Sequence, residues 1–232
     1  MKLAVCYPGE TPMVFMAFVE SALDLQRPAG YEIKWFRGLG WCQARRRNHA
    51  AEQALAWGAD LIVTLDIDQV YEPDILCRLV SRVDEGYHMV AAMVPSRGYV
   101  QGTGMKPFQR LAWKLEDKKF VPVDVGDGTM QKCEFPTSAA MIYRAGDLQK
   151  IGKPWYYFKY DQETWKQIHG EDAAFALRFQ REAGVQAWVD TTIRVKHAHV
   201  FQIDETFSDR FDDWSTPGNG DPSICSYESE DT

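Results

Sequence analysis

The sequence has no apolar run long enough to cross a membrane. Hydrophobic residues make up 45% of its 232 residues. The longest uninterrupted apolar stretches nevertheless have the length of single strands, far below the ~20 residues that a membrane-spanning helix needs. The opening MKLAVCYPGETP has one lysine and a short apolar run that ends at proline and glycine. It predicts a first strand and its turn, not a secretory signal. We therefore expect a globular protein without membrane insertion.

Cysteine is also sparse, and its spacing is uninformative for metal binding. The five cysteines are Cys6, Cys42, Cys77, Cys133 and Cys225, and they lie far apart in no paired spacing. An odd, scattered set argues against a disulfide framework and against a cysteine zinc site. It predicts reduced thiols in a cytoplasmic compartment.

The chain has no surplus of positive charge. Its formal net charge is -7, and residues 204–232 contain nine acidic residues and one arginine. The acidity therefore belongs to this tail, and the preceding residues are close to neutral. A generally basic surface for nucleic acid is not visible. We expect one domain over residues 1–203, followed by an acidic tail over 204–232 that is partly packed or flexible.

What the sequence does contain is an alternation of strand and helix patterns. Strands are predicted at residues 2–7, 31–36, 61–66 and 87–94, and helices at 13–25, 44–57 and 73–86. The apolar residues of the third strand are continuous, which predicts burial on both faces. Repeated strand, helix, strand units imply right-handed crossovers and a mainly parallel sheet. The fold class is therefore α/β and Rossmann-like, with helices flanking a central sheet.

The second half is less regular at first. Residues 98–135 predict loops and a small additional β region. Beyond them we expect a strand at 135–144, a short helix at 145–152, a helix at 170–184 and two strands at 185–190 and 193–201.

Asp66 and Asp68 form the first candidate site, at the end of the strand in DLIVTLDIDQ. Alternation along an extended backbone can turn both carboxylates the same way. Two carboxylates at a strand end suit a hard divalent cation that bridges to phosphate oxygens. Aspartate is also common where strands stop, so a role in a turn is the alternative.

Three further groups accompany this pair. Arg45, Arg46 and Arg47 precede Asn48 at the start of a helix, where guanidinium groups and backbone amides suit phosphate. At most one or two of three successive arginines can face the same way, and we favour Arg47. A solvated helix face is the alternative.

Glu171 and Asp172 stand in the first turn of a later helix, as a general base or as dipole-stabilising charges. His197 and His199 lie at alternate positions of a late strand. Either could complete the coordination of a cation, although packed or surface histidines are common.

In this order the segments resemble nucleotide-sugar glycosyltransferases of the GT-A fold, close to the family 2-like group of bacteria and phages. The segments that carry the resemblance are RRRNHAAEQALAWGADLIVTLDID, FPTSAAMIYRAGDLQKIGKPWYYFKYD and HGEDAAFALRFQREAGVQAWVDTTIRVKHAHVF. The resemblance covers residues 1–203 and leaves the tail outside. It implies a GT-A fold, and a bacterial or phage-infected host cytoplasm as the location.

The resemblance also implies roles for individual residues. Asp66 and Asp68 match the DxD motif, which holds Mn²⁺ or Mg²⁺ against the donor's diphosphate. His197 matches the late histidine that can ligate the metal, with His199 as the alternative. The remaining implied residues are Arg47, Asn48 and Pro8 near the nucleotide, and Glu171 and Asp172 in the Glu-Asp motif, where the aspartate is the usual catalytic base.

The implied activity is transfer of a sugar from a nucleoside-diphosphate sugar, UDP-sugar before GDP-sugar, to an acceptor hydroxyl. Pro136, Thr137, Ser138, Ala139 and Ala140 stand where many relatives have a glycine-rich segment beside the acceptor. The acceptor is therefore open between a saccharide, a protein, a small molecule and a modified DNA base. The alternatives are a nucleotidyltransferase acting on sugar phosphates and a non-catalytic sugar-nucleotide-binding module of the same fold.

Overall fold

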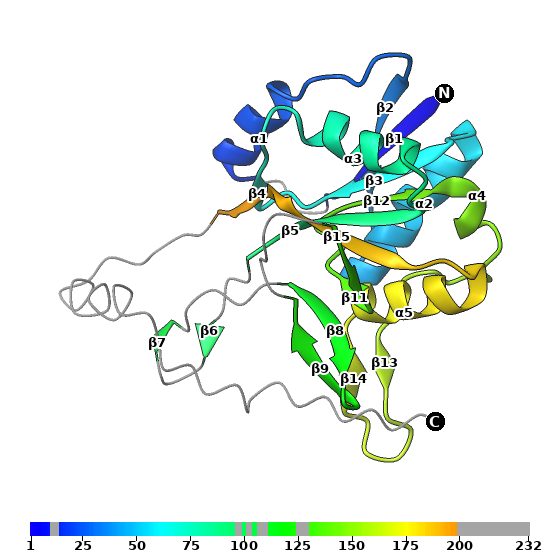
Figure 1. The fold of residues 1–232 in the computed structure, drawn as a ribbon. Helices are drawn as coiled ribbons and strands as arrows, with labels where there is room; N and C mark the ends of the chain where they lie inside the picture. The colour runs from blue at the N-terminus through cyan, green and yellow to red at the C-terminus, as the bar shows by residue number, and fades with distance from the viewer. Residues whose placement is uncertain (10–13, 96–98, 101–103, 106–110, 124–129, 199–232) are drawn as a thin grey trace.

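A computed structural model describes residues 1–9, 14–95, 99–100, 104–105, 111–123 and 130–198. Strand and helix alternate along the first half, as the hydrophobic pattern predicts (Figure 1). This half contains β1 (Lys2–Pro8), α1 (Met16–Leu23), β2 (Glu32–Gly38), α2 (Gln43–Trp57), β3 (Leu61–Leu65), β4 (Gln69–Val70), α3 (Ile75–Asp84) and β5 (Met89–Met93). Among the described residues no helix is long and apolar enough to cross a membrane.

The described residues of the second half contribute several short strands and two further helices. They are β6 (Tyr99–Val100), β7 (Gly104–Met105), β8 (Ala112–Glu116), β9 (Lys119–Pro122), β10 (Met130–Cys133), β11 (Phe135–Pro136), β12 (Ala140–Arg144), α4 (Ala145–Leu148), β13 (Lys159–Tyr160), β14 (Gln167–His169), α5 (Glu171–Ala183), β15 (Ala187–Arg194) and β16 (Lys196–His197). The boundary predicted between two late strands, at 185–190 and 193–201, is wrong, because β15 continues through residue 190 to Arg194 and β16 begins at Lys196. Residues 199–201 of the second predicted strand lie outside the described residues.

The central sheet has seven strands in the order β10, β15, β5, β12, β3, β1, β2. β1 pairs in parallel with β2 and β3, and β15 pairs in parallel with β5. β12 lies antiparallel between β3 and β5, and β10 is antiparallel to β15. The sheet is therefore mainly parallel, which confirms the predicted fold class. The antiparallel β12 has a consequence for the site, because the segment that leads into it starts at the carboxyl edge of the parallel strands.

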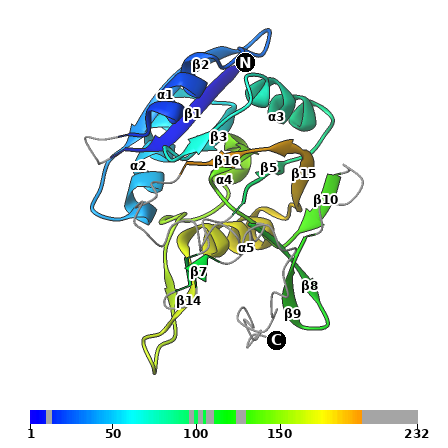
Figure 2. The ribbon, with the colours of Figure 1, turned by 90° about the vertical axis from the view of Figure 1, so that its left-hand side faces the viewer.

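Helices cover both faces of this sheet (Figures 1 and 2). Leu3 and Val5 of β1 face one hydrophobic cluster, to which α1 and α3 contribute. Ala4 and Cys6 face the other cluster, to which α2 and α5 contribute. The alternation of β1 side chains between two cores follows from the pleat of an extended strand.

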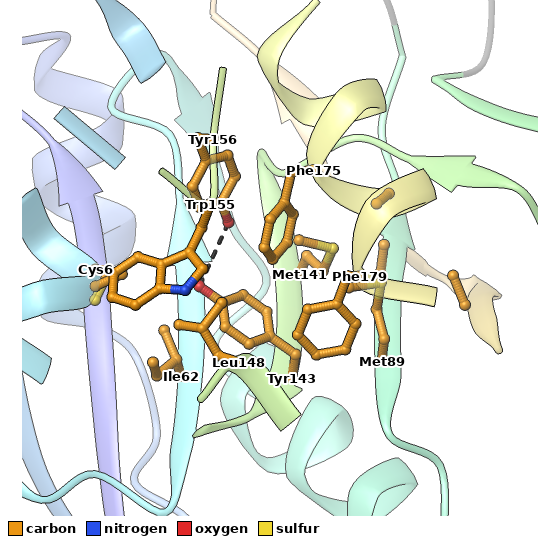
Figure 3. Packing of buried hydrophobic residues seen from close by; sticks show 14 of the residues in the cluster. Cys6, Ile62, Met89, Met141, Tyr143, Leu148, Trp155, Tyr156, Phe175 and Phe179 are labelled. Atoms are coloured by element: carbon orange, nitrogen blue, oxygen red, sulfur yellow. Dashed lines mark hydrogen bonds between the residues drawn. The ribbon is translucent and has the colours of Figure 1, made fainter. Parts of the chain in front are cut away.

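Aromatic side chains fill the core beneath α5 (Figure 3). The rings of Tyr156 and Phe175 stack with centroids 4.0 Å apart, and Phe175 lies 5.4 Å from Phe179. Tyr143 and Tyr156 share a hydrogen bond of 3.4 Å between their hydroxyl groups. Trp155 and Tyr156 are 3% and 1% exposed, so they pack the core and do not offer a face to a ligand.

Two small sheets project from the side of the molecule below α5 in both views (Figures 1 and 2). One consists of β11, β8 and β9, and the other is the β13–β14 hairpin. Both sheets contact α5, the first through β11 and the second through β14. β8 and β9 fall within residues 98–135, where the sequence predicts a small additional β region, whereas the β13–β14 hairpin was not predicted.

Candidate functional site

The candidate site lies at the carboxyl edge of the parallel strands, where ligands of open α/β sheets usually bind. Asp66 follows β3 directly, and its backbone amide donates to the carbonyl of Ala139 at 2.9 Å. Ala139 belongs to the segment that leads into the antiparallel β12. Tyr71 donates its hydroxyl to the carbonyls of Asp66 and Ala139, at 2.7 and 3.0 Å. The ends of two neighbouring strands are thereby tied together under the predicted DxD pair.

Arg47 connects three parts of the site. Its side chain is 4% exposed, and Nη2 lies 2.9 and 3.1 Å from the two carboxylate oxygens of Asp66. Nη1 donates to the carbonyl of Ser138 at 3.1 Å, and Nε lies 3.4 Å from Oε1 of Glu171. Arg47 is thus the arginine that faces inward, while Arg45 is exposed. In this structure it pairs with carboxylates, and its predicted contact with a nucleotide stays a prediction.

The carboxylates outnumber this one guanidinium. Asp66 and Glu171 both have raised pKa values, first because burial disfavours their charged forms and also because neighbouring carboxylates repel them. Arg47 lowers both values but does not offset the burial. In turn, Asp66 and Glu171 raise the pKa of Arg47, so that the guanidinium stays charged despite its burial. The edge therefore has an excess of negative charge that a bound cation would relieve.

His197 is brought beside Asp68 by the short ladder between β16 and β4. In this antiparallel pair His197 stands opposite Gln69, and the amide of Ala198 donates to the carbonyl of Asp68 at 2.8 Å. His197 Nε2 lies 3.5 Å from Oδ2 of Asp68, which is beyond a normal hydrogen bond. The predicted meeting of the DxD motif with a late histidine is present at these two residues.

The other ring nitrogen of His197 defines the tautomer. Nδ1 lies 2.9 Å from the carbonyl oxygen of Pro95, and a carbonyl can only accept, so we infer that Nδ1 carries the proton. Nε2 is buried without a hydrogen-bond partner and lies 3.5 Å from Oδ2 of Asp68. A histidine that donates one nitrogen to a backbone carbonyl and aims the other at a carboxylate has the arrangement of a metal ligand.

A cation at this site would need ligands from a bound nucleotide as well as from the protein. Among the described residues no three His, Cys, Asp or Glu side chains surround one common point. Asp68 and His197 form a pair, whereas Asp66 turns to Arg47. Mg²⁺ typically uses one or two carboxylates together with phosphate oxygens and water. These side chains thus fit a metal ion that binds together with a nucleotide. Asp66 would lie near the ion without contacting it, or would become a ligand after its carboxylate separates from Arg47.

Glu171 and Asp172 begin α5, after Gly170 as the residue before the helix. They point to different partners. Glu171 contacts Arg47, while Oδ2 of Asp172 lies 3.3 Å from the Thr137 hydroxyl. Asp172 also borders a cavity that contains Gly170 and Thr137. The arrangement leaves Asp172 next to open space, which a general base requires.

Asn48 is buried and holds the segment that precedes α5. Its Oδ1 accepts from the amides of Trp155 and Tyr156, at 3.0 and 3.1 Å. Its Nδ2 donates to the carbonyls of Tyr156 and Ala44, at 2.7 and 2.8 Å. The structure therefore gives Asn48 a positioning role, and a direct contact with a nucleotide stays a prediction.

Pro8 ends β1 at the same edge of the sheet, opposite Gly38 of β2. A Cβ atom on Gly38 would lie 2.1 Å from the carbonyl oxygen of Arg46, so only glycine allows β2 to approach α2 this closely. His199 and the acidic tail over 204–232 lie outside the described residues. Four cysteines within the described part of the chain are free thiols, as expected.

Several residues of the site were not expected from the sequence. Tyr71, Ser138 and Thr137 contact the predicted residues through single backbone or hydroxyl groups. Trp113 lines the cavity beside Asp172 from β8. No local pattern marks these positions. Only Thr137 and Ser138 had a signal in the sequence, since they stand where many members of the similar family have a glycine-rich segment.

Three solved structures share the arrangement of elements seen in this chain. A197 from STIV matches with a TM-score of 0.50 and 14% identity over 88% of this chain and 99% of that one. S. aureus TarS 1-349 matches with a TM-score of 0.51 and 16% identity over 85% of this chain and 60% of that one. GalNAc-T7, solved with UDP, GalNAc and Mn²⁺, matches with a TM-score of 0.55 and 12% identity over 87% of this chain and 44% of that one.

These likenesses establish the fold, and the predicted GT-A fold is confirmed. No protein-family model and no curated protein matches the chain. The chain spans less than two thirds of the TarS and GalNAc-T7 structures. The narrower family 2-like assignment, the metal and the site roles stay predictions.

Proposed function

We propose that the protein is a metal-dependent glycosyltransferase that moves a sugar from a nucleoside-diphosphate sugar to an acceptor hydroxyl. The observation that carries the proposal is the pair of Asp68 and His197 in a GT-A fold, with the buried Nε2 of His197 lying 3.5 Å from the carboxylate. Neither a turn aspartate nor a packed histidine needs this arrangement.

Asp68 and His197 would hold Mn²⁺ or Mg²⁺, with Asp66 close behind them. The cation would supply positive charge for the departing diphosphate. Uridine diphosphate is favoured weakly over guanosine diphosphate as the leaving group, and the presence of UDP and Mn²⁺ in the similar GalNAc-T7 structure supports this choice. Arg47 keeps Asp66 and Glu171 in position through its ion pairs with both carboxylates.

Asp172 would act on the acceptor. Its carboxylate takes the hydroxyl proton as the acceptor oxygen forms a bond to the anomeric carbon of the donor. The bond from that carbon to the diphosphate oxygen breaks, and its electron pair leaves with the nucleoside diphosphate. Thr137, at 3.3 Å, orients one oxygen of Asp172.

A thermal-shift screen of UDP- and GDP-sugars with and without Mn²⁺ tests the donor and the metal together. A sugar nucleotide that binds the folded state should raise the melting temperature, more strongly with Mn²⁺. Asp68→Ala and His197→Ala should each abolish the Mn²⁺-dependent part of the shift. His88→Gln, which changes a histidine at the opposite edge of the sheet, is the matched control. An unchanged Mn²⁺-dependent shift in Asp68→Ala would contradict the metal assignment.

Asp172→Asn separates binding from chemistry. The variant should keep the thermal shift by sugar nucleotide and lose at least about a hundredfold in transfer, the usual contribution of a general base. Release of nucleoside diphosphate by the unmodified protein supports the proposal. Release of pyrophosphate would instead identify a nucleotidyltransferase, and binding without any turnover a non-catalytic module.

A further inference from the structure

A cavity of about 240 Å³ opens beside Asp172, between the start of α5 and the two small sheets. Its apolar wall is formed by Trp113 of β8 and Phe135 of β11, whose rings stack with centroids 5.0 Å apart at 25°. Phe120 packs edge-on against Phe135 at 4.9 Å and supports this wall from behind. The aromatic face is thus held rigidly in place before any ligand binds.

Polar groups line the same cavity. Thr137 and Asp172 contribute a hydroxyl and a carboxylate, which lie 3.3 Å apart. Gln167 and His169 border the cavity from β14. The lining therefore combines aromatic surface with hydrogen-bonding groups that include the proposed base.

Gly170 keeps the space between these polar groups open. A Cβ atom built on Gly170 would lie 3.3 Å from Oδ1 of Asp172 and 3.9 Å from Nε2 of Gln167. Both polar atoms therefore border the position that a methyl group would fill. The backbone of Gly170, at φ -66° and ψ 169°, is open to any residue. The missing side chain is thus explained by space in the cavity and not by backbone strain.

The volume of the cavity and the charge of its lining residues limit the class of ligand that it can bind. The cavity is smaller than the roughly 300–1,000 Å³ typical of sites for drug-sized ligands, so it suits a single ring and not an extended chain. Among the described residues that line it there is no lysine or arginine, and Asp172 is acidic. This lining disfavours a phosphate-bearing acceptor such as a nucleic acid or a phospholipid headgroup.

We propose that this cavity binds one sugar ring of a saccharide acceptor, with the ring's C–H face on Trp113 and its hydroxyls toward Gln167 and Asp172. The inference rests on the proposed function for the identity of the reaction. The occupancy of the cavity is separately measurable. Aromatic rings favour flat, rigid apolar partners, and a few polar groups in the same cavity fix the orientation of a hydroxylated ring.

Saturation-transfer NMR with methyl glycosides of glucose, galactose and N-acetylglucosamine tests the site without turnover. At least one glycoside should bind the unmodified full chain, and Trp113→Ala should weaken it by about tenfold. Trp113→Phe should restore part of the affinity. Gly170→Ala should also weaken binding, while its melting temperature should stay close to that of the unmodified protein. This second variant keeps the test valid if Trp113→Ala does not fold. Trp165→Ala, at a residue that is 74% exposed and outside the cavity, is the matched aromatic control.

The outcomes separate the two proposals. Glycoside binding that both cavity variants weaken, in a protein that never turns over a sugar nucleotide, keeps the cavity and overturns the glycosyltransferase. Sugar-nucleotide turnover with no glycoside binding, or with binding that Trp113→Ala and Gly170→Ala leave unchanged, overturns the saccharide site alone. Nucleosides or serine peptides that bind in place of every glycoside would overturn it as well.

Discussion

At the scale of single residues, Arg47 was predicted to bind a ligand, but in the structure its side chain binds other parts of the protein. Its three donor nitrogens contact Asp66, Ser138 and Glu171, which come from three separate segments. Planar guanidinium geometry makes this possible, since one rigid fork can reach three acceptors at once. The residue therefore joins Asp66, at the end of β3, to Glu171, at the start of α5, and holds these two segments together.

Arg47→Met should destabilise the protein by about 3–5 kcal/mol, because it leaves Asp66 and Glu171 buried without their counter-charge. Arg47→Lys should recover little, since one ammonium group cannot reach all three acceptors. Urea unfolding at pH 7 measures both. Arg45→Met, which removes an exposed arginine of the same helix, is the matched control. Equal losses in Arg45→Met and Arg47→Met would show that the buried contacts contribute nothing.

At the scale of elements, short antiparallel pairings carry residues from far along the chain to the DxD edge. β16 pairs with β4 and thereby places His197 beside Asp68. The segment before β12 places Ser138 beside Arg47. The alternation of strands and helices and the starts of α2 and α5 could be predicted, because they follow from local periodicity and from glycine. The direction of β12 could not, since pairing partners depend on tertiary contacts. For the same reason no pattern pointed to Trp113.

Asn48 joins α2 to the segment that leads toward α5. Asn48→Ala should cost about 3 kcal/mol, because the amides of Trp155 and Tyr156 and the carbonyl of Tyr156 lose buried partners. Chemical denaturation measures the loss. Gln53→Ala removes a more exposed amide of the same helix, which donates to the carbonyl of Arg37 at 3.0 Å, and should cost far less. A loss in Asn48→Ala no larger than in Gln53→Ala would contradict the positioning role.

At the scale of the whole molecule, the two edges of the sheet have different tasks. The proposed site occupies the carboxyl edge of the parallel strands, whereas Asp147 lies at the opposite edge, after β12. Asp147 is 4% exposed in its side chain and lies 2.6 Å from both His88 Nδ1 and Lys150 Nζ. Burial raises its pKa, but the hydrogen bonds from Lys150 and His88 outweigh burial, and the net pKa is lowered. This cluster serves stability at a distance from the proposed chemistry.

Asp147→Asn should therefore lower stability without changing sugar transfer. Because the folded pKa of Asp147 is below its unfolded value, its contribution is present at pH 7 and is lost as the pH falls from about 4 through the folded pKa. The variant should be less stable than the unmodified protein by about 1 kcal/mol at pH 7, a modest value because Lys150 and His88 are half exposed. The difference should shrink in urea titrations below about pH 4. Glu182→Gln, an exposed carboxylate on α5 with a lowered pKa, is the control and should change stability less. A deficit in Asp147→Asn that persists unchanged at low pH, or a loss of transfer in the folded variant, would show that stability and chemistry are not divided between the two edges.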